Sequence, residues 1–297
     1  MARTTKTYRA ILTFIAAVFC AHPASAEPYV WQLNKGELTY SVIGTIHFGD
    51  QPPQPLPTPL PQLLQQANGL IVEADIRHTS APTDFPAGPI VADVLNSEQQ
   101  TELKRRANEL NLPWPGVLGL QPWLVAIHLQ QLQAQQHGLR PQWGIDLAAM
   151  ATAESFDVPI FELEDLDSQF TMLQSLPENG GELLLQTLDE WDHSESLLPC
   201  LLPAWREGDI AFFKEQFDLD TSMPDTEQAL LTDRNQAWVN ALMDNYSSGH
   251  YVVMVGMLHL IGPDSLPKLL QQQDFTLIAP QRKSASINYT EGNCTIK

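Results

Sequence analysis

The chain has 297 residues and a formal net charge of −19, with 16 Lys and Arg residues against 35 Asp and Glu residues. Such an acidic surface repels nucleic acid and anionic membranes, so we expect neither as a partner. The length and the 43% hydrophobic content suit one large folded unit and exclude collagen-like and disordered chains.

The first 26 residues have the composition of a secretory signal peptide. Arg3, Lys6 and Arg9 precede an apolar run, residues 10–21, and the segment ends on Ala24-Ser25-Ala26 without any acidic residue. We therefore expect residues 27–297 to form the mature protein, secreted or periplasmic. No later stretch approaches the roughly 18 apolar residues of a membrane helix, so no membrane span is expected. Cys200 and Cys294 remain after cleavage, and whether they form a disulfide is open.

Apolar runs rich in β-branched residues predict strands along the chain, and longer segments with helical periodicity lie between them. The predicted strands are Tyr29–Leu33, Leu38–Ile46, Gly69–Val72, Val158–Leu163, Tyr251–Leu258 and Phe275–Ile278. The predicted helices are Trp123–His137, Asp146–Ser155, Gly181–Asp192, Gln228–Met243 and Ser265–Gln273. This order predicts an α/β fold, with a mainly parallel or mixed central sheet flanked by helices.

Two further features concern the edges of this sheet. The first two strands are joined across Asn34-Lys35-Gly36, which predicts an antiparallel hairpin at the N-terminal edge. The segment Gln51–Pro61 carries six prolines and can form neither a helix nor a central strand. It is either a stiff connector or a rim beside a binding site.

Two predicted strands end in the same Gly-x-x-His pattern. One is Gly44-Thr45-Ile46-His47 and the other is Gly256-Met257-Leu258-His259. Ligands of open α/β sheets bind beyond the carboxyl ends of the strands, and a glycine there lets backbone or ligand approach closely. One such histidine is usually structural, but the repetition favours a site.

Carboxylates follow two other predicted strands. Glu73 comes directly after Gly69–Val72, where it is either a helix cap or a site residue. Glu162 and Glu164 alternate with apolar residues, which a solvent-facing edge strand explains equally well. Glu164 lies nearer the strand end and is the better site candidate.

One arginine lies on an apolar helix face. Arg234 follows Leu230 by four residues and precedes Trp238 by four, which places it on the hydrophobic stripe of Gln228–Met243. A buried arginine needs a carboxylate partner, unless its side chain extends to solvent.

Two imidazoles and one or two carboxylates can hold Mn, Co or Zn. Such a metal polarises a carbonyl group and activates water, a carboxylate can move the proton, and Arg234 could stabilise the oxyanion. The same residues also allow a metal-free reaction in which a histidine, paired with Glu73, is the general base. A protein that only binds peptides or small ligands, or two structural histidines, are the remaining alternatives.

In its order of motifs the chain resembles the TraB/GumN family, which includes the animal Tiki metalloproteases. The resemblance rests on both Gly-x-x-His blocks and on five segments between them. These are Val72-Glu73-Ala74-Asp75, Gln121-Pro122-Trp123, Gly144-Ile145-Asp146, Leu163-Glu164-Asp165 and Asp233-Arg234-Asn235. Asp165 departs from the threonine of many relatives.

The resemblance implies a hydrolase whose α/β domain covers residues 27–297, is built from two related halves and depends on a divalent metal. His47, His259 and Glu73 would hold the metal, with Glu164 as an additional ligand. Glu73, Arg234 and His47 would be the catalytic residues, and the substrate would be a peptide or protein. The family is also distantly similar to metal-independent esterases that use a histidine base, a glutamate and an arginine.

Overall fold

The computed structural model describes residues 27–52, 55–77, 87–217, 223–278, 287–290 and 293–296. The predicted signal peptide lies outside these residues, as do Pro53 and Gln54 of the proline-dense segment. Within the described ranges, no helix is both long and apolar enough to cross a membrane.

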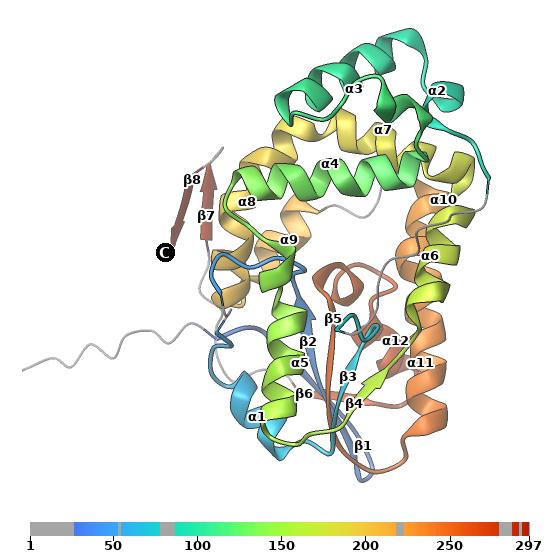
Figure 1. The fold of residues 1–297 in the computed structure, drawn as a ribbon. Coiled ribbons are helices and arrows are strands. Elements are labelled where there is room, and N and C mark those ends of the chain that lie inside the picture. Colours follow the sequence, from blue (N-terminus) through green and yellow to red (C-terminus); the bar gives the residue numbers. More distant parts are fainter. Residues whose placement is uncertain are drawn as a thin grey trace, which may run out of the picture.

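A six-stranded sheet forms the centre of the molecule, in the order β4-β3-β5-β2-β1-β6 (Figure 1). The strands are β1 (Val30–Lys35), β2 (Leu38–Thr45), β3 (Gly69–Val72), β4 (Ile160–Glu162), β5 (Gly249–Gly256) and β6 (Thr276–Ile278). β2, β3, β4 and β5 run parallel, whereas β1 is antiparallel to both of its neighbours. The predicted α/β fold with a mixed sheet is confirmed, and the hairpin β1–β2 forms. β6 extends the sheet beyond that hairpin. The two related halves and the domain limits stay predictions.

The register of the parallel strands determines where a site can form. β3 and the second half of β5 are buried, as fully apolar strands in the interior of a parallel sheet should be. β5 lies between β2 and β3, with Thr45 paired to Gly256 and Val72 paired to Met254. The three strands therefore end side by side, and the residues that follow each strand lie close together.

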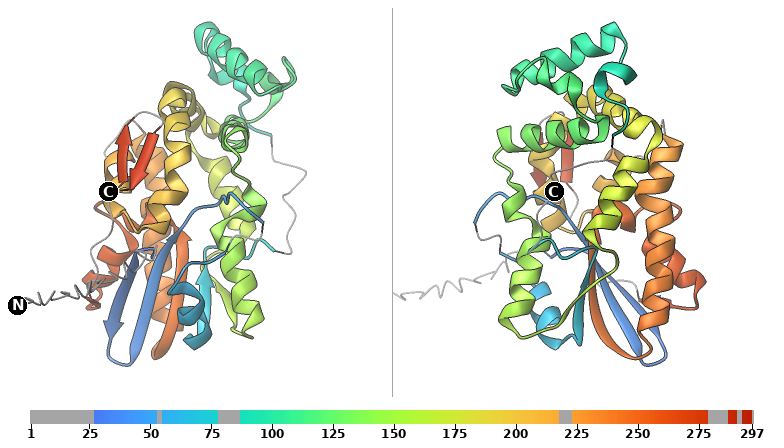
Figure 2. Two further views of the ribbon diagram at one scale, coloured as in Figure 1. Left: turned by 90° about the vertical axis from the view of Figure 1, so that its left-hand side faces the viewer. Right: turned by 45° about the vertical axis from the view of Figure 1, so that its right-hand side comes forward.

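Helices pack on the sheet and also form a second layer beyond its end (Figures 1 and 2). Those against the sheet are α1 (Leu60–Gln66), α5 (Ile145–Ser155), α11 (Asp233–Asn245) and α12 (Leu266–Gln272). The second layer has its own hydrophobic cluster and contains α2 (Val91–Val94), α3 (Ser97–Glu109), α4 (Pro122–Gln136) and α7 (Gly181–Asp189). The remaining α-helices are α6 (Leu166–Ser175), α8 (Trp191–Arg206), α9 (Ile210–Gln216) and α10 (Pro224–Glu227). Short 3-10 turns cover Gly116–Gly119, Pro141–Trp143, Pro177–Asn179 and Met257–Leu260, and a π-helical turn, Gln228–Thr232, precedes α11.

Every predicted helix has a counterpart, with two differences. The segment predicted as Gly181–Asp192 is divided, because α7 ends at Asp189 and α8 starts at Trp191. The segment predicted from Gln228 begins as the π-helical turn. Sequence patterns did not predict α2, α3, α6, α8, α9 or α10. In the two longest of these the pattern is obscured, because α3 has few apolar residues and α8 contains Pro199 and Pro203.

A disulfide between Cys200 and Cys294 answers the question that the sequence left open. It joins α8 to β8 (Asn293–Ile296), which pairs with β7 (Ile287–Thr290) in a separate two-stranded sheet. Figure 2 shows this pair beside α8 and apart from the central sheet. The two cysteines are 94 residues apart in sequence, so the disulfide closes a long loop in the unfolded protein.

Replacing both cysteines, in Cys200→Ala with Cys294→Ser, should lower the free energy of unfolding by about 2–5 kcal/mol. Denaturant unfolding of the variant and of the oxidised protein measures the difference. The reduced wild-type protein is the control and should unfold like the variant. Equal stability of the oxidised protein and the variant would contradict a structural role for the bridge.

Candidate functional site

Three of the sequence-predicted site residues meet around Gly256, at the end of β5. A Cβ atom placed on this glycine would lie 3.2 Å from Glu73 Oε1, 3.6 Å from His259 Cδ2 and 3.7 Å from His47 Nε2. The Gly256 N–H also donates to Glu73 Oε1 at 2.6 Å. A Cβ atom at this position would press on Glu73 Oε1 and would contact both histidines, so glycine keeps the space between these three side chains free.

Arg234 joins this group from α11 and connects it to Glu164. Its Nη2 donates to Glu73 Oε2 at 2.6 Å and also to Glu164 Oε1, while its Nε donates to Glu164 Oε1 at 3.1 Å. Its Nη1 bonds to His259 Nε2 at 3.0 Å and to the Leu230 carbonyl at 3.2 Å. Arginine has five N–H groups, so each of them has an acceptor here. The carboxylate partners expected for this arginine are thus Glu73 and Glu164.

Trp238 supports the same group from one helical turn further along α11. The Arg234 guanidinium lies 4.6 Å from the centre of the Trp238 ring, and the His259 ring lies 4.3 Å from it. The indole N–H also donates to Glu164 Oε2 at 3.3 Å. A cation over an indole face is attracted by the ring, so Trp238 adds to the stability of the buried arginine.

His259 is buried, with 4% of its surface exposed, and both of its ring nitrogens have partners. Nδ1 lies 2.8 Å from Asn235 Oδ1, and Nε2 faces Arg234. Because a guanidinium can only donate, Nε2 must accept, and the ring proton lies on Nδ1. Burial lowers the pKa of His259 to about 3, an effect that Arg234 and His47 strengthen and Glu73 opposes. His259 is therefore neutral at neutral pH.

His47 has a different environment. Its side chain is 63% exposed, and its Nδ1 lies 2.9 Å from Asp146 Oδ2. The Asp146 carboxylate raises the pKa of His47 to about 9, because its charge and its hydrogen bond stabilise the imidazolium. In turn His47 holds the pKa of Asp146 below its usual range, although burial alone would raise it. The two Gly-x-x-His histidines thus carry different charges at neutral pH.

Asp146 reaches His47 because the chain before α5 lies against the loop that follows β2. Ile145 N donates to the Ile46 carbonyl at 3.0 Å. A Cβ on Gly144 would lie 3.0 Å from the His47 carbonyl carbon and oxygen. A glycine at position 144 therefore permits the close backbone approach that brings the carboxylate to the imidazole.

The carboxylate of Glu73 is ionised despite its burial. Burial raises its pKa, but the charges of Arg234 and His47 and the Gly256 N–H together lower it below the usual value. Glu164 lies in the same group, whereas Glu162 does not: its Oε2 accepts from the Asp75 backbone N–H at 2.9 Å. The structure thus brings together His47, Glu73, Glu164, Arg234 and His259.

Asp146, Asn235 and Trp238 contact the site residues, but sequence reasoning did not single them out as site residues. An acid in the first turn of a helix, such as Asp146, is usually attributed to the helix dipole. Trp238 lies on the hydrophobic stripe of Gln228–Met243, where an apolar side chain is explained by packing alone. The sequence signal for Asp146 and Asn235 was their position in segments that resemble the family.

The donor atoms are of types that divalent transition metals accept, but their arrangement does not suit a resident ion. His259 Nε2 and Glu73 Oε2 both bind the guanidinium of Arg234, as do the oxygens of Glu164. Among the described residues, no group of three His, Cys, Asp or Glu side chains is placed to hold a metal ion. The side chains as placed therefore do not fit the expected metal.

Removing the positive charge of Arg234 should destabilise the fold strongly. Arg234→Met leaves the carboxylates of Glu73 and Glu164 buried without a cation, which we expect to cost about 3–5 kcal/mol in denaturant unfolding. The matched control is Arg105→Met, since Arg105 pairs with Glu102 and Glu109 on the exposed face of α3. That change should cost at most about 1 kcal/mol. If both variants lost a similar amount of unfolding free energy, this would contradict the inference that Arg234 stabilises the fold by pairing with Glu73 and Glu164.

Comparison with known proteins gives the family of the chain. A sequence profile of the TraB/PrgY/gumN family matches residues 29–279. The chain is 35% identical over 243 residues to "Uncharacterized protein YbaP" of Escherichia coli (strain K12), covering 80% of this chain and 89% of that protein. It is 35% identical over 237 residues to the protein of the same name from Shigella flexneri, covering 77% and 87%. No solved structure matches the chain. With a family match over most of its length, the chain belongs to the TraB/PrgY/gumN family.

Proposed function

We propose that the protein is an exported hydrolase whose reaction centre lies beside Gly256. The observation that carries this proposal is the meeting of the His47–Asp146 pair with Glu73, Arg234 and His259 at the ends of three parallel strands. The composition of residues 1–26 supports a secreted or periplasmic location. Peptide or protein substrates follow from the resemblance to the Tiki metalloproteases.

The geometry favours the metal-free version of this reaction. A histidine that bears a carboxylate on Nδ1 and directs Nε2 to an open position is arranged as a general base. His47 has this arrangement, with Asp146 on Nδ1 and Nε2 directed toward Gly256. Neutral His47 would take a proton from water as the water oxygen bonds to the substrate carbonyl carbon. The same proton would then pass to the leaving group as the C–N or C–O bond breaks.

Glu73 and Arg234 would act on this reaction in different ways. The Glu73 carboxylate raises the pKa of His47 and so stabilises the imidazolium that forms when the base takes the proton. All five N–H groups of Arg234 already have acceptors, so a substrate oxyanion could bind to it only by displacing one of them. We therefore assign Arg234 the role of holding Glu73, Glu164 and His259 in place and supplying a positive charge.

Metal dependence is the second version, and one observation favours it. His47 Nε2 and Glu73 Oε1 lie within 4 Å of the same point, the Cβ position of Gly256, and His259 Nε2 lies 4.0 Å from Glu73 Oε1. Mn, Co or Zn could reach His259 Nε2 only if Arg234 released it. Glu73 and Glu164 would likewise have to exchange the guanidinium for the ion.

The pH dependence of hydrolysis tests the base. Because only neutral His47 can take the proton, kcat/KM should rise with pH and level off above the His47 pKa of about 9. Asp146→Asn removes the carboxylate that raises this pKa, so the rise should move to lower pH and the plateau should fall. Activity against a fluorogenic peptide library and a panel of esters measures both.

The matched control for Asp146→Asn is Glu195→Gln. Glu195 lies 3.3 Å from His137 Nε2 on the surface, so its loss should leave the pH profile unchanged. A profile that Asp146→Asn does not move, or one that falls as the pH rises through 9, would contradict the assignment of His47 as the base.

Chelation distinguishes the two versions. The metal-free version predicts that purified protein retains its turnover in excess EDTA and contains no stoichiometric metal by elemental analysis. Loss of activity in EDTA and its recovery with Mn, Co or Zn would establish the metal-dependent version instead. If no substrate is hydrolysed and His47→Ala retains ligand binding, the protein is a binding protein.

A further inference from the structure

A pocket lies beside the loop that follows His259, at Leu260, Ile261 and Gly262. It has a volume of about 580 Å³, within the range of about 300–1,000 Å³ that is usual for small-molecule sites. Leu260 and Ile261, which follow His259, form part of its wall, while none of the site residues described above lines it. It is therefore a cavity separate from the proposed reaction centre.

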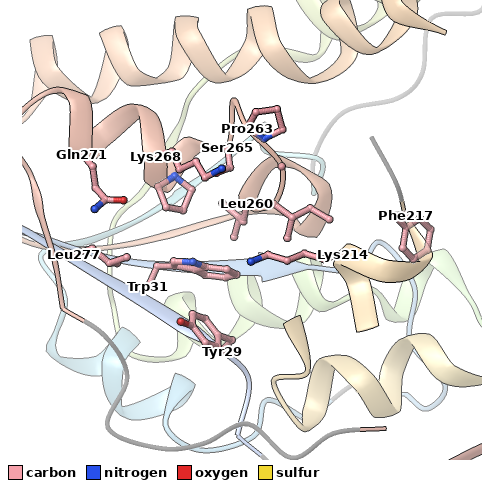
Figure 3. A pocket seen from close by; sticks show the side chains of 13 residues that line it. Tyr29, Trp31, Lys214, Phe217, Leu260, Pro263, Ser265, Lys268, Gln271 and Leu277 are labelled. Atoms are coloured by element: carbon pink, nitrogen blue, oxygen red, sulfur yellow. The ribbon is translucent and has the colours of Figure 1, made fainter. Parts of the chain in front are cut away.

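The floor of this pocket is aromatic. Tyr29 and Trp31, at the start of the chain's first strand, both line it, and their ring centroids lie 4.4 Å apart. Phe217, Leu260 and Leu277 add apolar surface around the floor (Figure 3). Such a surface can bind the flat or branched apolar part of a small molecule, because binding removes apolar area of both the pocket and the ligand from water.

The charged residues of the pocket are both lysines. Lys214 comes from α9 and Lys268 from α12, and Figure 3 shows Lys214 extending toward Trp31. No acidic side chain is among the described residues that line the pocket, although Glu215 and Asp264 adjoin lining residues in sequence. Within the described part of the chain, neither lysine forms an ion pair. In a protein of net charge −19 the pocket is thus a local region of positive charge.

We propose that this pocket binds a small organic anion that joins a carboxylate to an aromatic or branched aliphatic group. The carboxylate would lie between Lys214 and Lys268, and the apolar group would lie on Tyr29 and Trp31. Two lysines on separate helices can approach one carboxylate from different directions. This binding does not depend on the proposed hydrolase, because it needs no turnover.

Calorimetric titration of the purified protein with 3-phenylpropionate tests the proposal, with 3-phenylpropanamide as the neutral ligand of the same shape. The acid should bind saturably in the millimolar range or more tightly, and on the order of 10-fold more tightly than the amide, because two solvent-exposed ion pairs contribute modestly. Raising the ionic strength should weaken the binding of the acid alone, since salt screens exposed charges.

Variants locate the site. Lys214→Gln with Lys268→Gln should reduce the affinity for the acid to that of the amide, and Lys214→Arg with Lys268→Arg should retain most of it. Lys104→Gln, which removes an exposed lysine on α3, is the control and should change nothing. In NMR spectra the indole N–H signal of Trp31 should shift as the acid binds.

Four results would overturn the proposal. The first is equal affinity for acid and amide, and the second is an unchanged affinity in the double Gln variant. The third is an absence of saturable binding by protein whose thermal unfolding shows that it is folded. Binding that leaves the Trp31 signal unmoved would place the anion elsewhere and would also contradict the proposal.

Discussion

The arrangement of the candidate site depends on one largely buried cation, the side chain of Arg234, of which 14% is exposed. The guanidinium of Arg234 binds Glu73 after β3, Glu164 after β4, His259 after β5 and the Leu230 carbonyl one helical turn earlier. Buried carboxylates are costly without a counter-charge, and a buried guanidinium is costly without acceptors. The five N–H groups of Arg234 satisfy both requirements, so one side chain links three strand ends to α11.

The two histidines show how surroundings decide the chemistry of identical motifs. Each follows a glycine by three residues at the end of a buried parallel strand. His47 lies open to solvent beside Asp146 and favours the charged form, whereas His259 is enclosed by Arg234, Asn235 and Trp238 and stays neutral. Titratable groups with pKa values pushed apart are the usual basis for assigning acid and base roles. The proposed base is His47 in its neutral form, because Asp146 raises the proton affinity of His47, whereas His259 Nε2 already accepts from Arg234.

Much of this site could be inferred before its geometry was known. Strand ends in a parallel sheet meet at one edge, so His47, Glu73 and His259 could be expected together once their strands were recognised. Arg234 drew attention because charge on an apolar helix face requires a partner. The helices α3 and α8 could not be predicted, because polar composition in α3 and internal prolines in α8 obscure the helical pattern. Pairing His47 with Glu73 as in the metal-free alternative also missed Asp146, which is the direct partner.

The sequence by itself determined the strands, their burial and the polar residues at their ends, because these depend on local periodicity and on hydrophobic content. Only the tertiary structure decided which of those residues are partners. His47 and Asp146 are 99 residues apart, Arg234 and Glu73 are 161 apart, and Cys200 and Cys294 are 94 apart. Such pairs form only where the packing of separate elements brings them within bonding distance, and no local pattern encodes that distance. Whether an imidazole is charged, and whether a carboxylate faces an arginine or an open position, follows from the same packing.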